Sequence, residues 1–179
     1  MTFIVLTGSH GVGKTTLAEH LTSELGASRS VRLIPETARE LVRRGFKVND
    51  EMTEEGFIAY IQTYLKTVRE CQSELVLADR SLFDLYLYTH NSSEHIRPHF
   101  VEMLHELVFA EAKTVDLYVY LPVEFPLPQD EVRPPDEKYQ RHIDSEAERL
   151  LSYFGGRTVV ARGTIIQRAA TVIESLDHV

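Results

Sequence analysis

Short apolar stretches alternate along the chain with longer stretches whose apolar residues recur at helical spacing. Apolar runs of strand length occupy residues 2–7, 31–35, 75–78, 115–121 and 157–161. Between and after them, the spacing predicts helices over residues 15–21, 37–44, 54–74, 82–88, 96–111, 137–154 and 164–176. Strands that alternate with helices favour a three-layer α/β/α fold, with a five-stranded, mostly parallel sheet covered on both faces.

One segment departs from this alternation. Residues 122–135 hold five of the seven prolines, and the polar stretch at residues 129–141 carries Arg133, Lys138 and Arg141. Phosphoryl transfer needs cations around the moving group and the exclusion of water. If the protein transfers phosphoryl groups, residues 122–142 are a candidate lid, with Arg133 and Arg141 as its catalytic cations. The alternative is an exposed loop followed by a charged helix start.

Length and composition narrow the class of protein. The chain has 179 residues, and no interdomain linker or repeat is evident, so we expect one domain over residues 1–179. No apolar run reaches the ~20 residues that span a bilayer, and the first strand lacks the features of a signal peptide. Cys71 is the only cysteine, so no intrachain disulfide can form. These features predict a cytoplasmic protein with no membrane partner.

Residues 8–15 carry the most specific pattern in the sequence. They read Gly-Ser-His-Gly-Val-Gly-Lys-Thr and match G-x-x-x-x-G-K-[ST] at every fixed position, between a predicted strand and a predicted helix. The three glycines allow backbone conformations that a Cβ atom disfavours. The N–H groups of the loop can therefore converge on a phosphate at the positive end of a helix dipole.

This P-loop predicts ATP and Mg²⁺ as cofactors. Lys14 can reach the β- and γ-phosphates, where it would act catalytically, and the Thr15 hydroxyl can ligate Mg²⁺. The predicted nucleotide-binding residues of the loop are Gly8, Ser9, His10, Gly11, Val12, Gly13, Lys14, Thr15 and Thr16.

Two acids follow neighbouring predicted strands. In an open α/β sheet, ligands bind beyond the carboxyl ends of the strands, so both acids are candidates for catalysis. Asp79 ends an apolar strand and can hold Mg²⁺ or accept a proton, and Glu36 can act as general base for an acceptor hydroxyl. Arg39 and Arg80 lie close to them in sequence and are candidate substrate-binding residues. The alternatives are a surface acid at Asp79 and a helix-capping acid at Glu36.

The net charge of −8 argues against a protein that coats nucleic acid. Residues 29–47 nevertheless hold six cations against two acids, a local excess of four. This cluster is either a solvated helix face or a surface for an anionic acceptor. It keeps phosphorylation of a polynucleotide 5′-hydroxyl open as an alternative function.

Several short motifs come in a family's order: the P-loop, Pro-Glu-Thr-Ala-Arg at 35–39, Ala-Asp-Arg-Ser at 78–81 and Val-Arg-Pro-Pro-Asp-Glu-Lys-Tyr at 132–139. Together they resemble the small P-loop ATPase/kinase family that includes the nicotinamide-riboside kinase domain of bacterial NAD-regulator proteins. The Asp-Arg-Ser element is also similar to that of deoxynucleoside kinases. The resemblance implies a nucleoside- or nucleotide-kinase fold, and it implies that the turn at Arg162 and Gly163 lies near adenine.

These observations predict an ATP-dependent kinase that transfers the γ-phosphoryl group to a small acceptor, a nucleoside or a nucleotide. Besides the polynucleotide kinase, a regulatory nucleotide-binding module or NTPase with a protein partner stays open. The sequence also leaves open a homodimer, and whether Glu36 or Asp79 is the general base.

Overall fold

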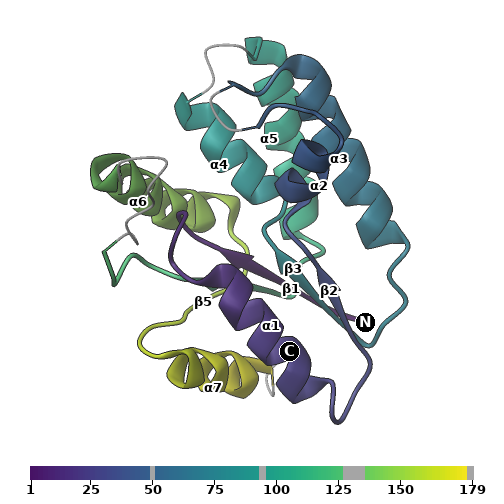
Figure 1. The fold of residues 1–179 in the computed structure, drawn as a ribbon, viewed down its shortest axis with the longest axis vertical. Helices are drawn as coiled ribbons and strands as arrows, with labels where there is room; N and C mark the ends of the chain where they lie inside the picture. The colour runs from purple at the N-terminus through teal and green to yellow at the C-terminus, as the bar shows by residue number, and fades with distance from the viewer. Residues whose placement is uncertain (49–50, 93–95, 127–135, 177–179) are drawn as a thin grey trace.

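A five-stranded parallel sheet forms the middle of the molecule (Figure 1). The computed structural model describes residues 1–48, 51–92, 96–126 and 136–176. All pairings between neighbouring strands are parallel, and the strand order is β2-β3-β1-β4-β5. The strands are β1 (Thr2–Thr7), β2 (Val31–Ile34), β3 (Leu75–Asp79), β4 (Leu117–Tyr120) and β5 (Thr158–Val160).

Helices cover both faces of this sheet, as the sequence predicted. They are α1 (Lys14–Leu25), α2 (Thr37–Arg43), α3 (Glu54–Arg69), α4 (Leu82–Ser92), α5 (Pro98–Ala112), α6 (Glu137–Phe154) and α7 (Ile165–Leu176). One hydrophobic core joins the sheet to α1 and α7, and a second joins the opposite face to α2 through α6 (Figure 1). No helix in the described part of the chain combines the length and apolarity needed to cross a bilayer.

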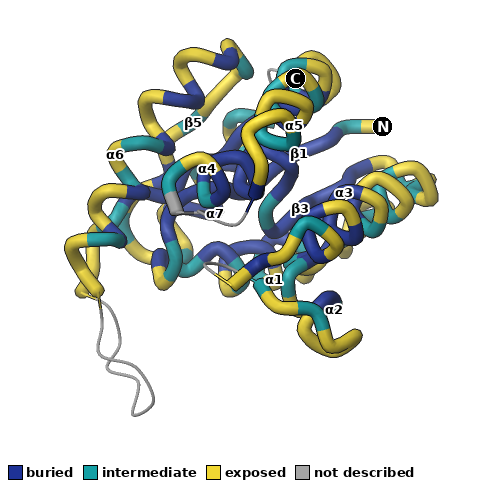
Figure 2. The backbone as a smooth tube through the Cα atoms, turned by 90° about the horizontal axis from the view of Figure 1, so that it is seen from above, coloured by how far each residue is buried: buried dark blue, intermediate teal, exposed yellow. Residues whose placement is uncertain are grey.

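The apolar character of the central strands follows from this double coverage. In β1, Phe3 and Val5 face the core with α2 through α6, whereas Ile4 and Leu6 face the core with α1 and α7. Because both faces are buried, every position needs an apolar side chain, so the strands read as continuous apolar runs. The central strands β1 and β3 are accordingly drawn mostly in the dark blue of buried residues in Figure 2.

The third helix is shorter than the 54–74 that the sequence predicted, because it ends at Arg69. The backbone of Glu74 already belongs to the edge of the sheet: its carbonyl accepts from the N–H of Thr2 at 2.8 Å. Its carboxylate accepts from the N–H of Ser30 at 2.9 Å. The chain must therefore leave the helix before residue 74 to enter β3 in register.

The strand order places the functional candidates at one edge. β1 is central, with Leu6 opposite Asp79 of β3 and Thr7 opposite Tyr120 of β4. β2 pairs with the outer side of β3, so the residues that follow β2 reach the same edge. The P-loop, residues 8–15, is called the phosphate-binding loop from here on. It follows β1, which lies between β3 and β4, and it passes close to the end of β4. A Cβ atom on Gly8 would lie 2.4 Å from the carbonyl oxygen of Leu121.

We expect Gly8→Ala to destabilise the fold by about 3 kcal/mol or more. The backbone φ of 131° disfavours an L side chain, and the carbonyl of Leu121 cannot give way easily because the N–H of the same residue is bonded to the carbonyl of Thr7 at 3.0 Å. Gly45→Ala is the matched control, since its φ is 86° but no atom lies within 4 Å. It should cost only about 1 kcal/mol, from backbone strain alone. Urea unfolding measures both, and equal losses would contradict the close contact.

Candidate active site

The phosphate-binding loop has the backbone conformation that the sequence predicted. Gly8, Gly11 and Gly13 have φ values of 131°, 74° and 90°, all in the region that favours glycine. Gly13 is also the N-cap of α1, so the loop runs directly into the N-terminus of that helix. The positive end of the helix dipole therefore faces the space that the loop encloses.

Lys14 is buried and folds back over its own loop. Its Nζ donates to the carbonyl oxygen of Gly8 at 2.9 Å and to that of Ser9 at 2.5 Å. Burial, followed by the nearby Arg80 guanidinium, lowers the pKa of Lys14 to about 7. Negative phosphate oxygens beside this amine would raise its pKa again, so phosphate binding and protonation of Lys14 favour each other.

Thr15 and Asp79 meet beneath the loop. The Thr15 hydroxyl donates to Oδ2 of Asp79 at 2.6 Å, and Asp79 is 3% exposed. A hydroxyl and a carboxylate are oxygen ligands of the kind that Mg²⁺ prefers. The two predicted metal ligands therefore fit that ion, although they come from segments 64 residues apart.

Glu36 lies beside this pair and is held by two arginines. Arg80 Nε contacts Glu36 Oε1 at 2.9 Å, and Arg39 Nε donates to Glu36 Oε2 at 3.1 Å. Arg39 also reaches the Thr15 hydroxyl at 3.5 Å. The structure thus brings Glu36, Arg39 and Arg80 together with Thr15 and Asp79. The Glu36 carboxylate makes no side-chain bond that caps α2, so it is directed into this network rather than toward its own helix.

Arg80 has an unusual backbone. Its φ of 79° is the only positive value among the described residues that are not glycine. This conformation follows the end of β3 and is stabilised by a hydrogen bond from Arg80 N–H to the carbonyl of Leu6. The guanidinium then lies between Glu36 and Asp84 and over the ring of Tyr88, at 5.0 Å from its centroid. The strained backbone of Arg80 thus directs its guanidinium into the site.

Asp84 is a site residue that the sequence reasoning missed. Its side chain is only 1% exposed, and it accepts from the Thr7 hydroxyl at 3.0 Å and from Arg80 at 3.3 Å. It also accepts from the N–H of Ser81, whose hydroxyl in turn accepts from the N–H of Phe83. This reciprocal arrangement is a capping box at the start of α4. The spacing of Ser81 and Asp84 was the available signal.

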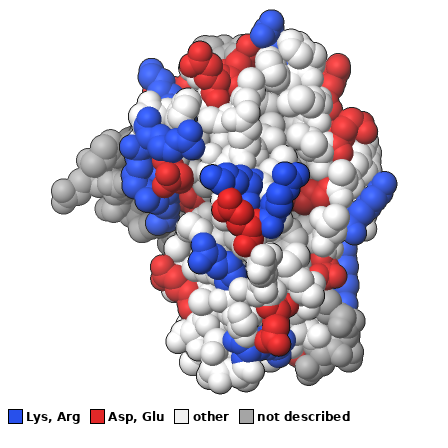
Figure 3. All heavy atoms as spheres, turned by 90° about the vertical axis from the view of Figure 1, so that its right-hand side faces the viewer, with Lys and Arg blue, Asp and Glu red and all other residues white. Residues whose placement is uncertain are grey.

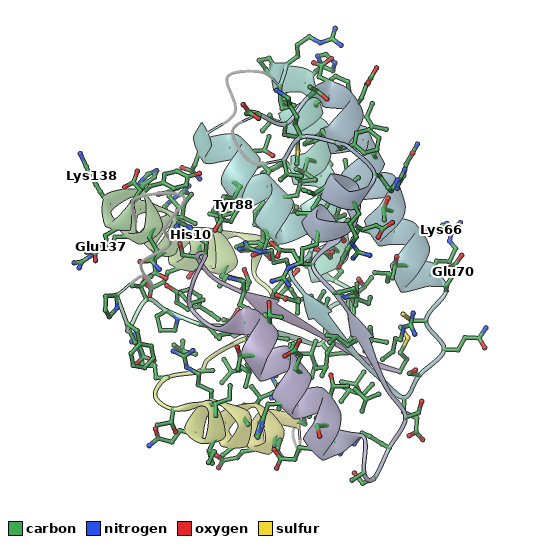
Figure 4. The ribbon with its side chains drawn as sticks, in the orientation of Figure 1. His10, Lys66, Glu70, Tyr88, Glu137 and Lys138 are labelled. Atoms are coloured by element: carbon green, nitrogen blue, oxygen red, sulfur yellow. The ribbon has the colours of Figure 1, made fainter. Side chains whose placement is uncertain are left out.

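The first turn of α6 lies against the outside of the phosphate-binding loop. Nε2 of the buried Gln140 donates to the carbonyl of His10 at 2.8 Å, and the rings of His10 and Tyr139 stack at 6.1 Å. Figure 4 shows His10 beside α6, with Glu137 and Lys138 of that helix projecting outward. Burial, together with Arg80 and Lys14, lowers the pKa of His10.

A second contact with the outside of the phosphate-binding loop comes from α7. Arg168 is 4% exposed; its Nη1 donates to the carbonyl of Val12 at 2.6 Å, and its Nη2 to Glu124 Oε2 at 2.8 Å. Glu124 also accepts from the N–H of Gly163 at 2.8 Å and pairs with Arg162 at 3.8 Å. The predicted adenine-side turn is therefore tied through Glu124 and Arg168 to the phosphate-binding loop.

Other predicted residues lie elsewhere. Arg133 is outside the described residues, as are residues 127–135 of the predicted lid. Arg141 forms an exposed pair with Glu137 at 3.8 Å, and no contact with the loop is found for it in the described part of the chain. Tyr60, Tyr64 and Phe83 are buried in the core, and Tyr88 contacts the site through Arg80.

A separate hollow of about 860 Å³ opens between α4 and α5. Tyr86, His90 and His105 are among its lining residues. None of its lining residues belongs to the phosphate-binding loop or to the network around Glu36. Because charged, buried and strained residues converge at the carboxyl edge of the sheet instead, that edge is the candidate active site.

A buried acid of α5, Glu111, lies at the N-terminus of α4. Its carboxylate accepts from the Ser81 hydroxyl at 2.8 Å and from the N–H groups of Leu82 at 3.4 Å and Phe83 at 3.2 Å. It therefore anchors the N-terminus of the helix that carries Asp84. Burial raises the pKa of Glu111 to about 7, against these hydrogen bonds and that of Tyr64, which favour the ionised form.

Comparison with known proteins agrees with this architecture. A family model described as an AAA domain matches residues 3–168. No curated protein sequence matches the chain. A structure of the NadR protein in complex with NR is similar with a TM-score of 0.75 and 21% identity, over 97% of this chain and 51% of that chain.

Two further structures share the fold. The NadR protein in complex with NAD and AMP-PNP has a TM-score of 0.72 and 20% identity, over 99% of this chain and 49% of that one. Thymidylate kinase from Ehrlichia chaffeensis has a TM-score of 0.63 and 17% identity, over 98% of each chain. The chain thus spans about half the length of the NadR chains. These likenesses confirm the predicted P-loop fold of nucleoside- and nucleotide-kinase type.

The buried Glu111 predicts a pH dependence of stability. Its pKa is raised from an ordinary 4.5 to about 7, so between these values the unfolded chain releases a proton that the folded protein keeps. Its contribution therefore falls as the pH rises through this window, by up to about 3 kcal/mol. Glu111→Gln should flatten the dependence of the unfolding free energy on pH between about 4.5 and 7.

The matched control is Glu106→Gln, which changes an exposed acid of the same helix. Urea unfolding at a series of pH values compares the two variants with the wild type. The control should keep the wild-type slope. An unchanged slope in Glu111→Gln would mean that this carboxyl does not hold its proton in the folded state.

Proposed function

The chain belongs to the family described as an AAA domain, and we propose that it is an ATP-dependent kinase that phosphorylates a nucleoside or a nucleotide. In this proposal the phosphate-binding loop holds the triphosphate, and Thr15 and Asp79 hold Mg²⁺. Mg²⁺ held by these two residues would supply positive charge beside the phosphates.

One observation carries the proposal: a second acid, Glu36, lies beside Thr15 and Asp79. Asp79 is engaged by the Thr15 hydroxyl at 2.6 Å, which suits a metal holder. Glu36 is connected to the same hydroxyl through Arg39 and is oriented by Arg80. A protein that only binds ATP has no need of a second carboxylate directed by two arginines. An acceptor hydroxyl does need such a group, to align it and take its proton.

The proposed step uses these groups in a balanced way. The acceptor oxygen bonds to the γ-phosphorus while its proton passes to the Glu36 carboxylate. The bond from the γ-phosphorus to the β,γ-bridging oxygen breaks, and ADP leaves with that electron pair. Lys14 and Arg80 lie where negative charge builds up on the transferring group, so they stabilise the transition state.

The acceptor class is supported by what the similar proteins bind. The NadR protein is found with NR, and the Ehrlichia chaffeensis protein is a thymidylate kinase. In this chain Glu36 contacts Arg39 and Arg80, and the Arg80 guanidinium lies over the Tyr88 ring. A polar sugar beside the arginines and a planar base beside the ring suit these side chains.

The polynucleotide alternative gains little from the surface. Basic residues that follow β2 are paired with acids: Arg39 with Glu36, Arg43 with Glu40 and Lys47 with Glu51. Figure 3 shows basic and acidic side chains interspersed on the face that it draws. A surface that binds a nucleic-acid backbone usually presents cations without such partners.

Glu36→Gln and Asp79→Asn should separate the two acidic roles. Glu36→Gln should lower kcat by at least about tenfold, with an unchanged requirement for Mg²⁺. Asp79→Asn should raise the Mg²⁺ concentration needed for half-maximal rate, and Lys14→Ala should abolish transfer. Glu40→Gln, at an exposed pair on the same helix as Arg39, serves as control. Equal kinetic defects in the two acid variants would overturn the assignment.

A screen of acceptors tests the function itself. Nucleosides, nucleoside monophosphates, nicotinamide riboside and an oligonucleotide with a free 5′-hydroxyl are offered with labelled ATP. We expect labelled phosphate on a nucleoside or a nucleotide, with ADP release above an acceptor-free blank. ADP release that no acceptor stimulates would remove the kinase assignment, and label on the oligonucleotide alone would establish the polynucleotide alternative.

A further inference from the structure

Two carbonyl groups of the phosphate-binding loop are held by side chains from the far end of the chain. Gln140 of α6 donates to His10 O at 2.8 Å across 130 residues, and Arg168 of α7 donates to Val12 O at 2.6 Å across 156 residues. Both donors are buried, with exposures of 1% and 4%. Burial removes competing water, so these bonds fix the two carbonyls strongly.

Fixing a carbonyl also fixes the N–H that follows it. The described chain contains no cis peptide bond, and in a trans peptide the C=O and the next N–H point in opposite directions. With His10 O held outward, the N–H of Gly11 points inward. With Val12 O held outward, the N–H of Gly13 does the same.

The N–H groups that result have no other use within the described protein. Among the described residues, neither the backbone N–H of Gly11 nor that of Gly13 donates to a protein acceptor. Orphan donors that converge on one concavity are the groups that bind phosphate oxygens. The two outer bonds therefore determine the direction of donors that a phosphate meets.

We propose that Gln140 and Arg168 are positioning residues that orient the phosphate-binding N–H groups of Gly11 and Gly13 from outside the site. They lie in opposite layers of the fold, because α6 packs on one face of the sheet and α7 on the other (Figure 1). Each is restrained by its own surroundings. Arg168 is fixed by Glu124 at 2.8 Å, and Gln140 lies in the first turn of α6, with its N–H bonded to the Asp136 carbonyl at 3.0 Å.

The inference rests on the proposed function only in taking a nucleoside di- or triphosphate as the ligand of the loop. Its test measures binding and not transfer, so a failed acceptor screen and a failed positioning role give different results. The probes are ADP and inorganic tripolyphosphate. The variants are Gln140→Met, which removes the donor at nearly the same volume, and Arg168→Lys, which keeps the charge beside Glu124.

We expect each variant to weaken ADP and tripolyphosphate binding by the same factor of about tenfold, since the defect lies at the phosphates. In the ADP complex, hydrogen exchange at the Gly11 amide should quicken in Gln140→Met while Gly13 stays protected. Arg168→Lys should do the reverse. A merely structural role would loosen both amides together in either variant.

The controls lie on the same helices. His142→Ala removes a hydrogen bond from α6 to Asn91 of 3.1 Å, and Thr171→Ala removes an intrahelical bond of α7. Both should bind ADP within about twofold of wild type. The proposal is overturned by unchanged ADP binding in the two test variants, by loss of ADP binding with tripolyphosphate unaffected, or by equal losses in the controls. Should Gln140→Met fail to fold, Arg168→Lys carries the test through the Gly13 amide alone.

Discussion

The carboxyl edge of the sheet depends on opposite charges that are buried beside one another. The cations Lys14 and Arg80 lie among the carboxylates of Asp79, Asp84 and Glu36. A buried charge without a partner costs several kcal/mol, so each of these groups is tolerable only because the others are present. The requirement couples four elements: β3 must end where Asp79 meets Thr15 of α1, and α4 must begin where Asp84 meets Arg80. The position of Glu36 after β2 then follows from its contact with Arg80.

This mutual dependence explains why strain and buried polarity gather at one place. The left-handed backbone of Arg80 is unfavourable by itself, but it allows the guanidinium to contact Glu36, Asp84 and the Tyr88 ring together. Glu111 anchors the start of α4 by accepting from Ser81, and burial raises the pKa of its carboxyl. Holding these groups in one arrangement lowers the stability of the fold, but it leaves the site preorganised.

Much of the fold could be predicted because its signals are local. The glycine pattern at residues 8–13 requires particular dihedral angles, and strands that are buried on both faces need continuous apolar runs. Asp79 and Glu36 could be found for a topological reason, since residues after neighbouring parallel strands share an edge. The end of α3 was predicted wrongly because apolar spacing does not reveal where the chain must turn to enter β3 in register.

The supporting residues could not be predicted, since their meaning depends on packing between distant segments. Gln140 and Arg168 occur in helices with strong amphipathic patterns, where a polar residue is ordinarily exposed. Nothing near them in sequence indicates that they are buried against a loop more than a hundred residues earlier. The burial of Glu111 could not be predicted either, because an acid near a helix end usually faces solvent. Asp84 was more accessible, since its spacing from Ser81 matches a capping box.

The separation between the phosphate-binding loop and its two outer holders has a consequence for biosynthesis. A chain is made from its N-terminus, so residues 8–13 leave the ribosome early, whereas Gln140 and Arg168 emerge only after most of the sheet. Until then the loop has its glycines but not the bonds that direct its amides. Nucleotide affinity should therefore arise late during translation, and a nascent chain that ends before residue 168 cannot rely on ATP to stabilise it. A loop that is made before its two holders thus becomes competent only after them.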